Sequence, residues 1–362
     1  MNLIRSFSII SFFTILSRIA GFGRDILFAS FLGASVSADI FLLAFRIPNL
    51  FRRIYGEGVF HAAFIPIYIN SLKMKSSKKA IDFKSYATSF LIIILLLTLI
   101  FGEFFIRDII TSLAPGFSLS LIDKTVSLAT IMFPYLVFIS LSSVFGAIMN
   151  ASGRFALWSF TPILLNLFMI GSLLLSFIND KEPETFLAWS VFFAGLVQFL
   201  ILAFWLNKIG LSYPLKIPRL SPDIKKLFQL MLPSLFAGGI IQINQMIGTI
   251  FASSITGAIS WLYYADRVAQ LPLGIFGIAI AAALLPVLSE LITNKNEHKV
   301  KEQIDRAALI LLLLTFISAA GLITLSELIA DVLFRRGEFG YGDTVATAKA
   351  MVAYGMGLPA FA

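Results

Sequence analysis

Residues 85–102 read SYATSFLIIILLLTLIFG, a run without a single charged side chain. A helix rises about 1.5 Å per residue, so roughly 20 apolar residues cross the ~30 Å hydrocarbon core of a bilayer. The run therefore predicts a membrane-spanning helix. Uncharged runs of similar or greater length follow at 125–153, 155–179, 185–207, 227–265, 268–289 and 307–326, and another begins near residue 350. With two charge-bearing helices at about 7–31 and 37–69, the sequence predicts an all-α polytopic membrane protein of about ten transmembrane helices.

Composition agrees with this class. Of 362 residues, 58% are hydrophobic and 13% are charged, and the mean hydropathy is +0.91. Soluble domains have about 25% charged residues. The absence of cysteine excludes disulfides and thiol catalysis, and the two histidines, His61 and His298, lie too far apart in sequence to suggest a metal site. We expect no cofactor and no metal.

Charged loops predict the orientation. The net charge is +8, and the basic residues gather in a few loops, which favours membrane topology over nucleic-acid binding. Lysine-rich or arginine-rich segments at 71–85, 208–226 and 295–306 read as cytoplasmic, and the acidic segment 180–184 reads as external. The N-terminal apolar stretch has no A-x-A cleavage site and is followed by Arg18, so we interpret it as a retained first helix. The N-terminus is predicted to be cytoplasmic.

A weak internal repeat has an offset of 219 to 221 residues. Arg46-Ile47 precedes AAFIP at 62–66, and Arg267-Val268 precedes AALLP at 282–286. Met132 and Tyr135 are echoed by Met351 and Tyr354. Duplicated halves are a known transporter architecture. We therefore predict a six-helix bundle over 1–215 and a second, incomplete bundle over 216–362.

Charges inside membrane helices are costly and often functional. The first two helices carry Arg18, Arg24, Asp25, Asp39, Arg46, Arg52, Arg53 and Glu57. One interpretation is that the arginines snorkel to headgroups and act as topology anchors. The other, which suits Arg18 and Arg24 better, is a cavity for an anionic substrate, because guanidinium binds phosphate bidentately. The Asp266-Arg267 pair is either a self-satisfied ion pair at the interface or part of the same cavity.

Several segments resemble signatures of one family. They are SRIAGFGRD at 17–25, Ala38-Asp39, PNLFRRIYGEG at 48–58, AFIP at 63–66 and WLYYADR at 261–267. The chain is similar over its whole length to the lipid II flippases of the MurJ or MviN family, within the multidrug/oligosaccharidyl-lipid/polysaccharide exporter superfamily.

This resemblance implies two pseudo-symmetric six-helix bundles around a V-shaped central cavity. It also implies outward translocation of an undecaprenyl-pyrophosphate-linked disaccharide-pentapeptide across the bacterial cytoplasmic membrane by alternating access. It makes Arg18, Arg24, Asp39, Arg52 and Arg267 the substrate-binding residues. Asp25, Arg53, Glu57 and Asp266 are expected to support them. The implied partners are the lipid-linked substrate, the membrane and the cell-wall synthesis machinery.

Two features depart from the family pattern. Gln270 stands where many relatives carry an acid, and the family usually has about fourteen helices. From the repeat offset we expect the chain to be a C-terminally truncated form of a longer flippase, inactive alone.

Three rival functions remain open. One is a polysaccharide-lipid or drug exporter of the same superfamily, although a drug exporter for cationic substrates should have acidic cavity residues. Another is an integral membrane enzyme acting on lipid phosphates, for which no clustered acid–base or nucleophilic groups are visible. The third is a non-transporting scaffold, which would not need intramembrane arginine.

Overall fold

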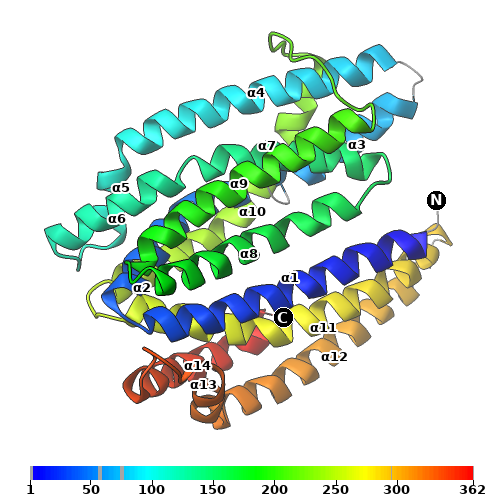
Figure 1. The fold of residues 1–362 in the computed structure, drawn as a ribbon. Helices are drawn as coiled ribbons and strands as arrows, with labels where there is room; N and C mark the ends of the chain where they lie inside the picture. The colour runs from blue at the N-terminus through cyan, green and yellow to red at the C-terminus, as the bar shows by residue number, and fades with distance from the viewer. Residues whose placement is uncertain (1–2, 56–58, 74–76, 295, 362) are drawn as a thin grey trace. The chain divides into compact units, whose positions relative to one another are not determined.

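The computed structural model describes residues 3–55, 59–73, 77–294 and 296–361, which form fourteen α-helices and no strand (Figure 1). Their bounds are α1 Leu3–Leu32, α2 Val36–Tyr55, α3 Val59–Lys73, α4 Ser77–Phe104, α5 Ile106–Leu113, α6 Leu119–Met132, α7 Tyr135–Ala151, α8 Ala156–Ile178, α9 Pro183–Lys208, α10 Pro222–Ala252, α11 Ala258–Thr293, α12 Glu297–Thr324, α13 Ser326–Phe334 and α14 Tyr341–Phe361.

Five segments within the described residues are long and apolar enough to cross a bilayer by themselves: Lys78–Phe104, Leu119–Ala151, Ala156–Ile178, Pro183–Lys208 and Glu297–Thr324. They coincide with five of the uncharged runs, and the all-α membrane class is confirmed. The total of about ten spanning helices stays a prediction. The second of these segments is interrupted where Pro134 separates α6 from α7, because proline cannot donate the hydrogen bond that would continue the helix.

One predicted boundary is left open and another is corrected. The helix expected over 37–69 covers α2 and α3, and residues 56–58 between them lie outside the described part of the chain, so its continuity stays a prediction. The turn between α10 and α11 falls at 253–257 rather than at the charged pair Asp266-Arg267, which lies inside α11. Charge was a poor guide there because the pair occupies a helix interior, whereas Gly257 supplies the left-handed backbone of the real turn, with φ of 85°.

The internal repeat is visible in the helix bounds. α4 and α12 differ by 220 residues at both ends, from Ser77 to Glu297 and from Phe104 to Thr324. Each is followed after one residue by a short helix, α5 or α13, and then by α6 or α14. α1 and α10 correspond at nearly the same offset. The two predicted halves, 1–215 and 216–362, rest on this repeat and remain a prediction.

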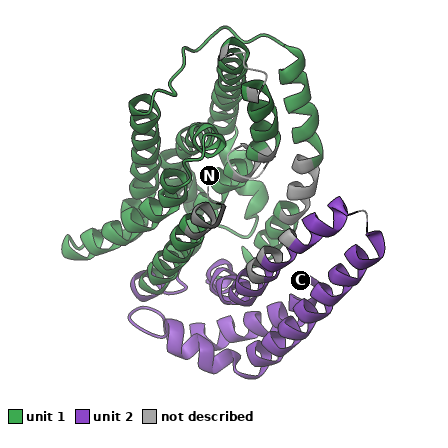
Figure 2. Cartoon of the chain, turned by 90° about the vertical axis from the view of Figure 1, so that its right-hand side faces the viewer, with its two compact units in different colours: residues 1–28, 36–256 green, residues 29–35, 257–362 purple. Residues whose placement is uncertain are grey.

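By contacts, the chain forms two compact units (Figure 2). The first contains residues 1–28 and 36–256, and the second contains residues 29–35 and 257–362. In the first unit α9 packs closely against α7 and α8. Gly195 allows part of this approach, since a Cβ there would lie 2.5 Å from the ring of Tyr135, which is buried.

The second unit is built from α11 to α14, with α14 packed against the other three helices. Its core contains Tyr264, whose ring centroid lies 5.0 Å from that of Phe334 and 5.3 Å from that of Phe339. The last turn of α1 and the residues after it also belong to this unit. Tyr264 donates a 2.8 Å hydrogen bond to the carbonyl oxygen of Gly33, and the backbone N–H of Glu338 donates to the Ser30 carbonyl at 2.9 Å.

Candidate functional site

The centre of the first unit's polar site is an ion pair within α1. Arg24 and Asp25 are 7% and 2% exposed. Arg24 donates from Nε at 3.0 Å and from Nη2 at 2.5 Å to the same oxygen, Oδ1 of Asp25. Buried charges persist when they are paired and hydrogen-bonded. The structure therefore buries the Arg24 guanidinium against its ion-pair partner within α1.

Asn166 of α8 holds the other side of this guanidinium. Its Oδ1 accepts a 3.1 Å hydrogen bond from Arg24 Nη1, and its Nδ2 donates at 3.2 Å to the carbonyls of Ser17 and Pro162. Asn166 also packs against Gly21, where an added Cβ would lie in ordinary van der Waals contact, 3.5 Å from the amide nitrogen. One amide thus joins two turns of α1 to α8 and fixes the direction of the Arg24 side chain.

Arg18 differs from Arg24 although both lie on α1. Arg18 is exposed, as are its neighbours Ile15 and Ile19, so this half of the helix is less covered by protein. The sequence analysis assigned both arginines to the same proposed cavity. The structure separates them into one buried, oriented guanidinium and one accessible guanidinium.

α2 supplies the next charges. Asp39 lies in the first turn and is 2% exposed, a position where the helix dipole favours a carboxylate. Arg46 is half-buried and donates at 3.0 Å to the Gln245 carbonyl of α10. Arg52 is half-buried, and its Nε donates at 3.0 Å to Oδ1 of Asn49.

Two of the predicted supporting residues, Arg53 and Glu57, lie near the end of α2. The side chain of Arg53 and all of Glu57 lie outside the described residues. Their supporting role therefore stays a prediction.

In the second unit the Asp266-Arg267 pair is half-buried. Asp266 accepts a hydrogen bond from Gln270 one turn later. The guanidinium carbon of Arg267 lies 4.8 Å from the ring centroid of Tyr263, a cation–π contact. Gln270, noted above as a departure from the family pattern, thus binds Asp266 where an acid would repel it.

Sequence reasoning missed four polar residues. It considered only charged side chains as functional groups, and it read the charged loops as signals of topology. Asn166 and Gln198 are buried amides in apolar spans; Gln198 donates at 2.7 Å to the Thr161 carbonyl. Glu184, read as part of an external loop, is 4% exposed and accepts from Ser37 at 2.9 Å. Lys84, read as a loop residue, is buried on α4. An amide inside a predicted span is the signal that would have found the first two.

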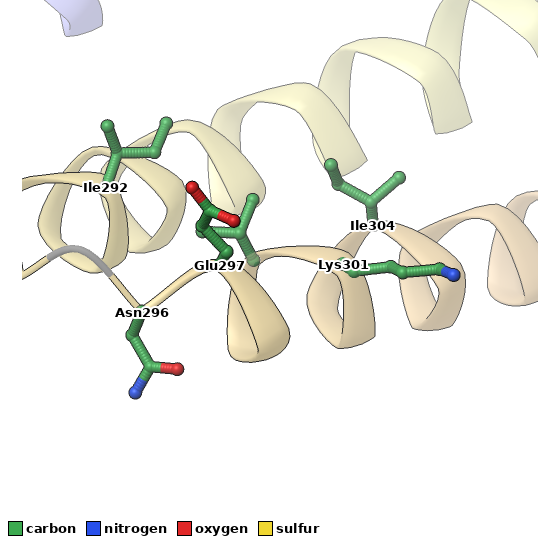
Figure 3. Close-up of a pocket in the computed structure, with 6 residues that line it drawn as sticks. Ile292, Asn296, Glu297, Lys301 and Ile304 are labelled. Atoms are coloured by element: carbon green, nitrogen blue, oxygen red, sulfur yellow. The ribbon is translucent and has the colours of Figure 1, made fainter.

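A surface pocket of about 590 Å³ lies at the α11–α12 turn and is lined by none of these arginines (Figure 3). Glu297 and Lys301 are the charged residues that line it, and Figure 3 shows Lys301 extending away from Glu297. With one acid and one base, it has no excess positive charge for a polyanionic substrate.

Comparison with known proteins then decides the family. A model of the family "Lipid II flippase MurJ" matches residues 28–362. The chain belongs to the MurJ family of lipid II flippases. A probable lipid II flippase MurJ from Rhizobium tropici is 37% identical over 367 residues, which cover 100% of this chain and 69% of the relative. Its counterpart from Rickettsia prowazekii (strain Madrid E) is 36% identical over 363 residues, covering 100% and 71%.

Solved structures agree with the MurJ assignment. A lipid II flippase MurJ in an inward closed conformation has a TM-score of 0.82 at 27% identity, covering 97% of this chain and 72% of that one. An inward-facing multidrug resistance MATE family transporter has a TM-score of 0.73 at 15% identity, covering 95% and 79%. The second similarity shows a shared fold, as the superfamily assignment predicted. Membership of a transporter family also confirms that the chain is not an enzyme.

Proposed function

We propose that the chain contributes to outward translocation of lipid II, an undecaprenyl-pyrophosphate-linked peptidoglycan precursor, across the bacterial cytoplasmic membrane by alternating access. The observation that carries this proposal is the buried Arg24, fixed by Asp25 and Asn166 inside α1 of a MurJ family member. A guanidinium is retained in such a place at considerable energetic cost, which favours a functional role over an anchoring role.

The proposed substrate contacts are Arg18, Arg24, Asp39, Arg52 and Arg267. A pyrophosphate is anionic and presents several acceptor oxygens, and arginine remains charged and offers a planar fork of donors. In this scheme Asp25 orients Arg24, and Asp266, Arg53 and Glu57 support the same chemistry. Arg18 meets the substrate as an exposed group, whereas Arg24 is already held in one direction.

Orientation and partners complete the proposal. The basic segments at 71–85, 208–226 and 295–306 support a cytoplasmic N-terminus under the positive-inside rule. The enzymes of cell-wall synthesis are the natural partners of a protein that delivers their precursor. The rival function, export of polysaccharide-linked lipids or drugs, draws on the MATE fold similarity, but that similarity at 15% identity concerns the fold alone.

The test is complementation of cells depleted of their own flippase, with measurement of whether lipid II becomes accessible at the outer leaflet. Alanine at Arg18, Arg24, Arg52 or Arg267 should abolish rescue at normal membrane levels. Lysine should lower the rate about tenfold or more, because a charge-assisted hydrogen bond contributes roughly 1.5–3 kcal/mol and a point charge cannot replace the fork.

Arg107→Ala is the matched control, because Arg107 is an exposed arginine paired with Asp123 outside the site. It should rescue fully. Full rescue by alanine at all four positions would contradict the phosphate-binding proposal, and full rescue by lysine at all four would show that charge alone matters.

A further inference from the structure

The connection between α9 and α10, residues 209–221, is bound along one face of α4, and we call it the strap. Figure 1 shows this segment running beside the beginning of α4. Ser85 and Ser89 of α4 each donate a 2.7 Å hydrogen bond, to the Pro214 and Lys216 carbonyls respectively. Lys84 Nζ donates at 2.7 Å to the Leu211 carbonyl. Three strap carbonyls are therefore satisfied by side chains of one helix face, so this part of the strap is fixed rather than free.

Side-chain contacts reinforce the same attachment. Lys216 forms an ion pair with Asp82 at 2.5 Å, and the hydroxyls of Thr88 and Tyr213 lie 2.6 Å apart. Burial raises the pKa of the Tyr213 hydroxyl above the usual tyrosine value of 10.0, so the group stays protonated at neutral pH.

The outward edge of the strap is apolar. Leu215, Ile217 and Leu220 are 60%, 85% and 62% exposed. Between Leu215 and Ile217, the side chain of Lys216 turns toward Asp82 of α4, whereas the two aliphatic side chains remain exposed. Single exposed aliphatic residues are common. Three such residues within six positions of a fixed segment form an apolar cluster, and burial of this cluster against another surface would be favourable.

The position of the strap along α4 identifies that cover. α4 changes from polar to apolar directly after Ser89, and beyond this point Ile93, Leu97 and Ile100 are exposed as lipid-facing residues are. Just before the strap, Lys208 lies 4.5 Å from the ring centroid of Trp205, and tryptophan with lysine is typical of the membrane–water interface. Both features place the strap at headgroup level.

Charge selects the kind of lipid. The exposed charged residues from 205 to 226 are all basic: Lys208, Arg219, Lys225 and Lys226. Basic residues beside exposed aliphatic side chains are the pattern of segments that lie on anionic bilayers, where the charges attract headgroups and the aliphatic groups enter the acyl boundary. We propose that the strap is a docking surface for anionic phospholipid headgroups of the adjoining leaflet, with Leu215, Ile217 and Leu220 inserted below them.

The chain has no cysteine, so one can be placed on the strap without background. The full chain with Ile217→Cys is labelled at this cysteine with a polarity-sensitive fluorophore. The labelled protein is reconstituted in phosphatidylcholine vesicles with or without phosphatidylglycerol. Asn294→Cys, exposed at the end of α11, is the control. At position 217 we expect a blue-shifted emission that spin-labelled lipid quenches, and we expect phosphatidylglycerol to increase the blue shift. At position 294 we expect little blue shift and little quenching by spin-labelled lipid.

The charge requirement is tested with matched double variants. Lys208→Gln/Arg219→Gln should lower the equilibrium constant for insertion of the label into phosphatidylglycerol-containing bilayers by about fivefold per charge removed, whereas Lys299→Gln/Lys301→Gln should leave it unchanged. All four positions are exposed, so the fold is not at risk. Aqueous quenching by iodide at 217 equal to that at 294, a shift indifferent to phosphatidylglycerol, or equal effects of the two double variants would each overturn the proposal.

Discussion

Replacing Asp25 with asparagine tests whether the α1 ion pair is as buried as the structure indicates. The change keeps the size of the side chain and one acceptor oxygen, but it removes the negative charge that faces Arg24. Arg24 is 7% exposed. Leaving a buried charge without its counter-ion costs about 3–5 kcal/mol, and the amide oxygens of Asn166 and of the new side chain at position 25 offset part of this. We therefore expect a loss of about 3 kcal/mol in the free energy of unfolding.

The double variant Arg24→Gln/Asp25→Asn separates stability from function. It removes both charges and keeps polar groups that hydrogen-bond to each other, so its cost should be well below the sum of the two single changes. The measurement is reversible denaturant unfolding in mixed micelles, combined with the complementation assay. We expect the double variant to be folded and inactive, because no guanidinium remains at position 24.

The exposed pair Arg107–Asp123, at 55% and 58% side-chain exposure, provides the control. Asp123→Asn should cost at most about 1 kcal/mol, the usual limit for a solvated ion pair. If Asp25→Asn costs no more than this control, the burial argument fails. If the double variant rescues flippase-depleted cells, the charge of Arg24 is dispensable and its proposed contact with the substrate is wrong.

Two further predictions concern the second unit and the orientation. Tyr264→Phe removes the donor to the buried Gly33 carbonyl and should destabilise the chain by about 1–3 kcal/mol in the same unfolding assay, whereas Tyr341→Phe, at an exposed tyrosine, should change it little. In intact cells, a cysteine at Lys78 should react only with membrane-permeant reagents and one at Glu182 also with impermeant reagents; the reverse labelling would contradict the proposed cytoplasmic N-terminus.

Much of the fold followed from the sequence because the bilayer imposes a length and a polarity on each span. The run 85–102 lies within α4, and the run 185–207 became α9 within a few residues. The repeat also survived, since its offset reappears in the bounds of α4 and α12. What failed was the use of charge as a boundary marker at Asp266-Arg267, where a half-buried pair sits inside a helix.

Tertiary partners of the charged residues could not be predicted in the same way. Nothing local to α1 indicates that its arginine will meet an amide from α8, 142 residues later. Likewise, nothing in the sequence indicates that Ser30 and Gly33, at the end of α1, accept hydrogen bonds from Glu338 and Tyr264. Such contacts depend on three-dimensional packing, which hydropathy and periodicity do not encode.

The structure also changes the electrostatic argument on which the function rests. The described part of α1 and α2 from residue 9 to 52 has four arginines and two aspartates, so a count alone gives an excess of positive charge. The pair with Asp25 largely offsets the charge of Arg24, which leaves this residue as an oriented donor rather than a source of long-range attraction. In the proposed site, attraction of an anion then rests more on Arg18, which is exposed. A substrate with a pyrophosphate suits this division, because its charge responds to the accessible arginine and its oxygens require a donor held in one direction.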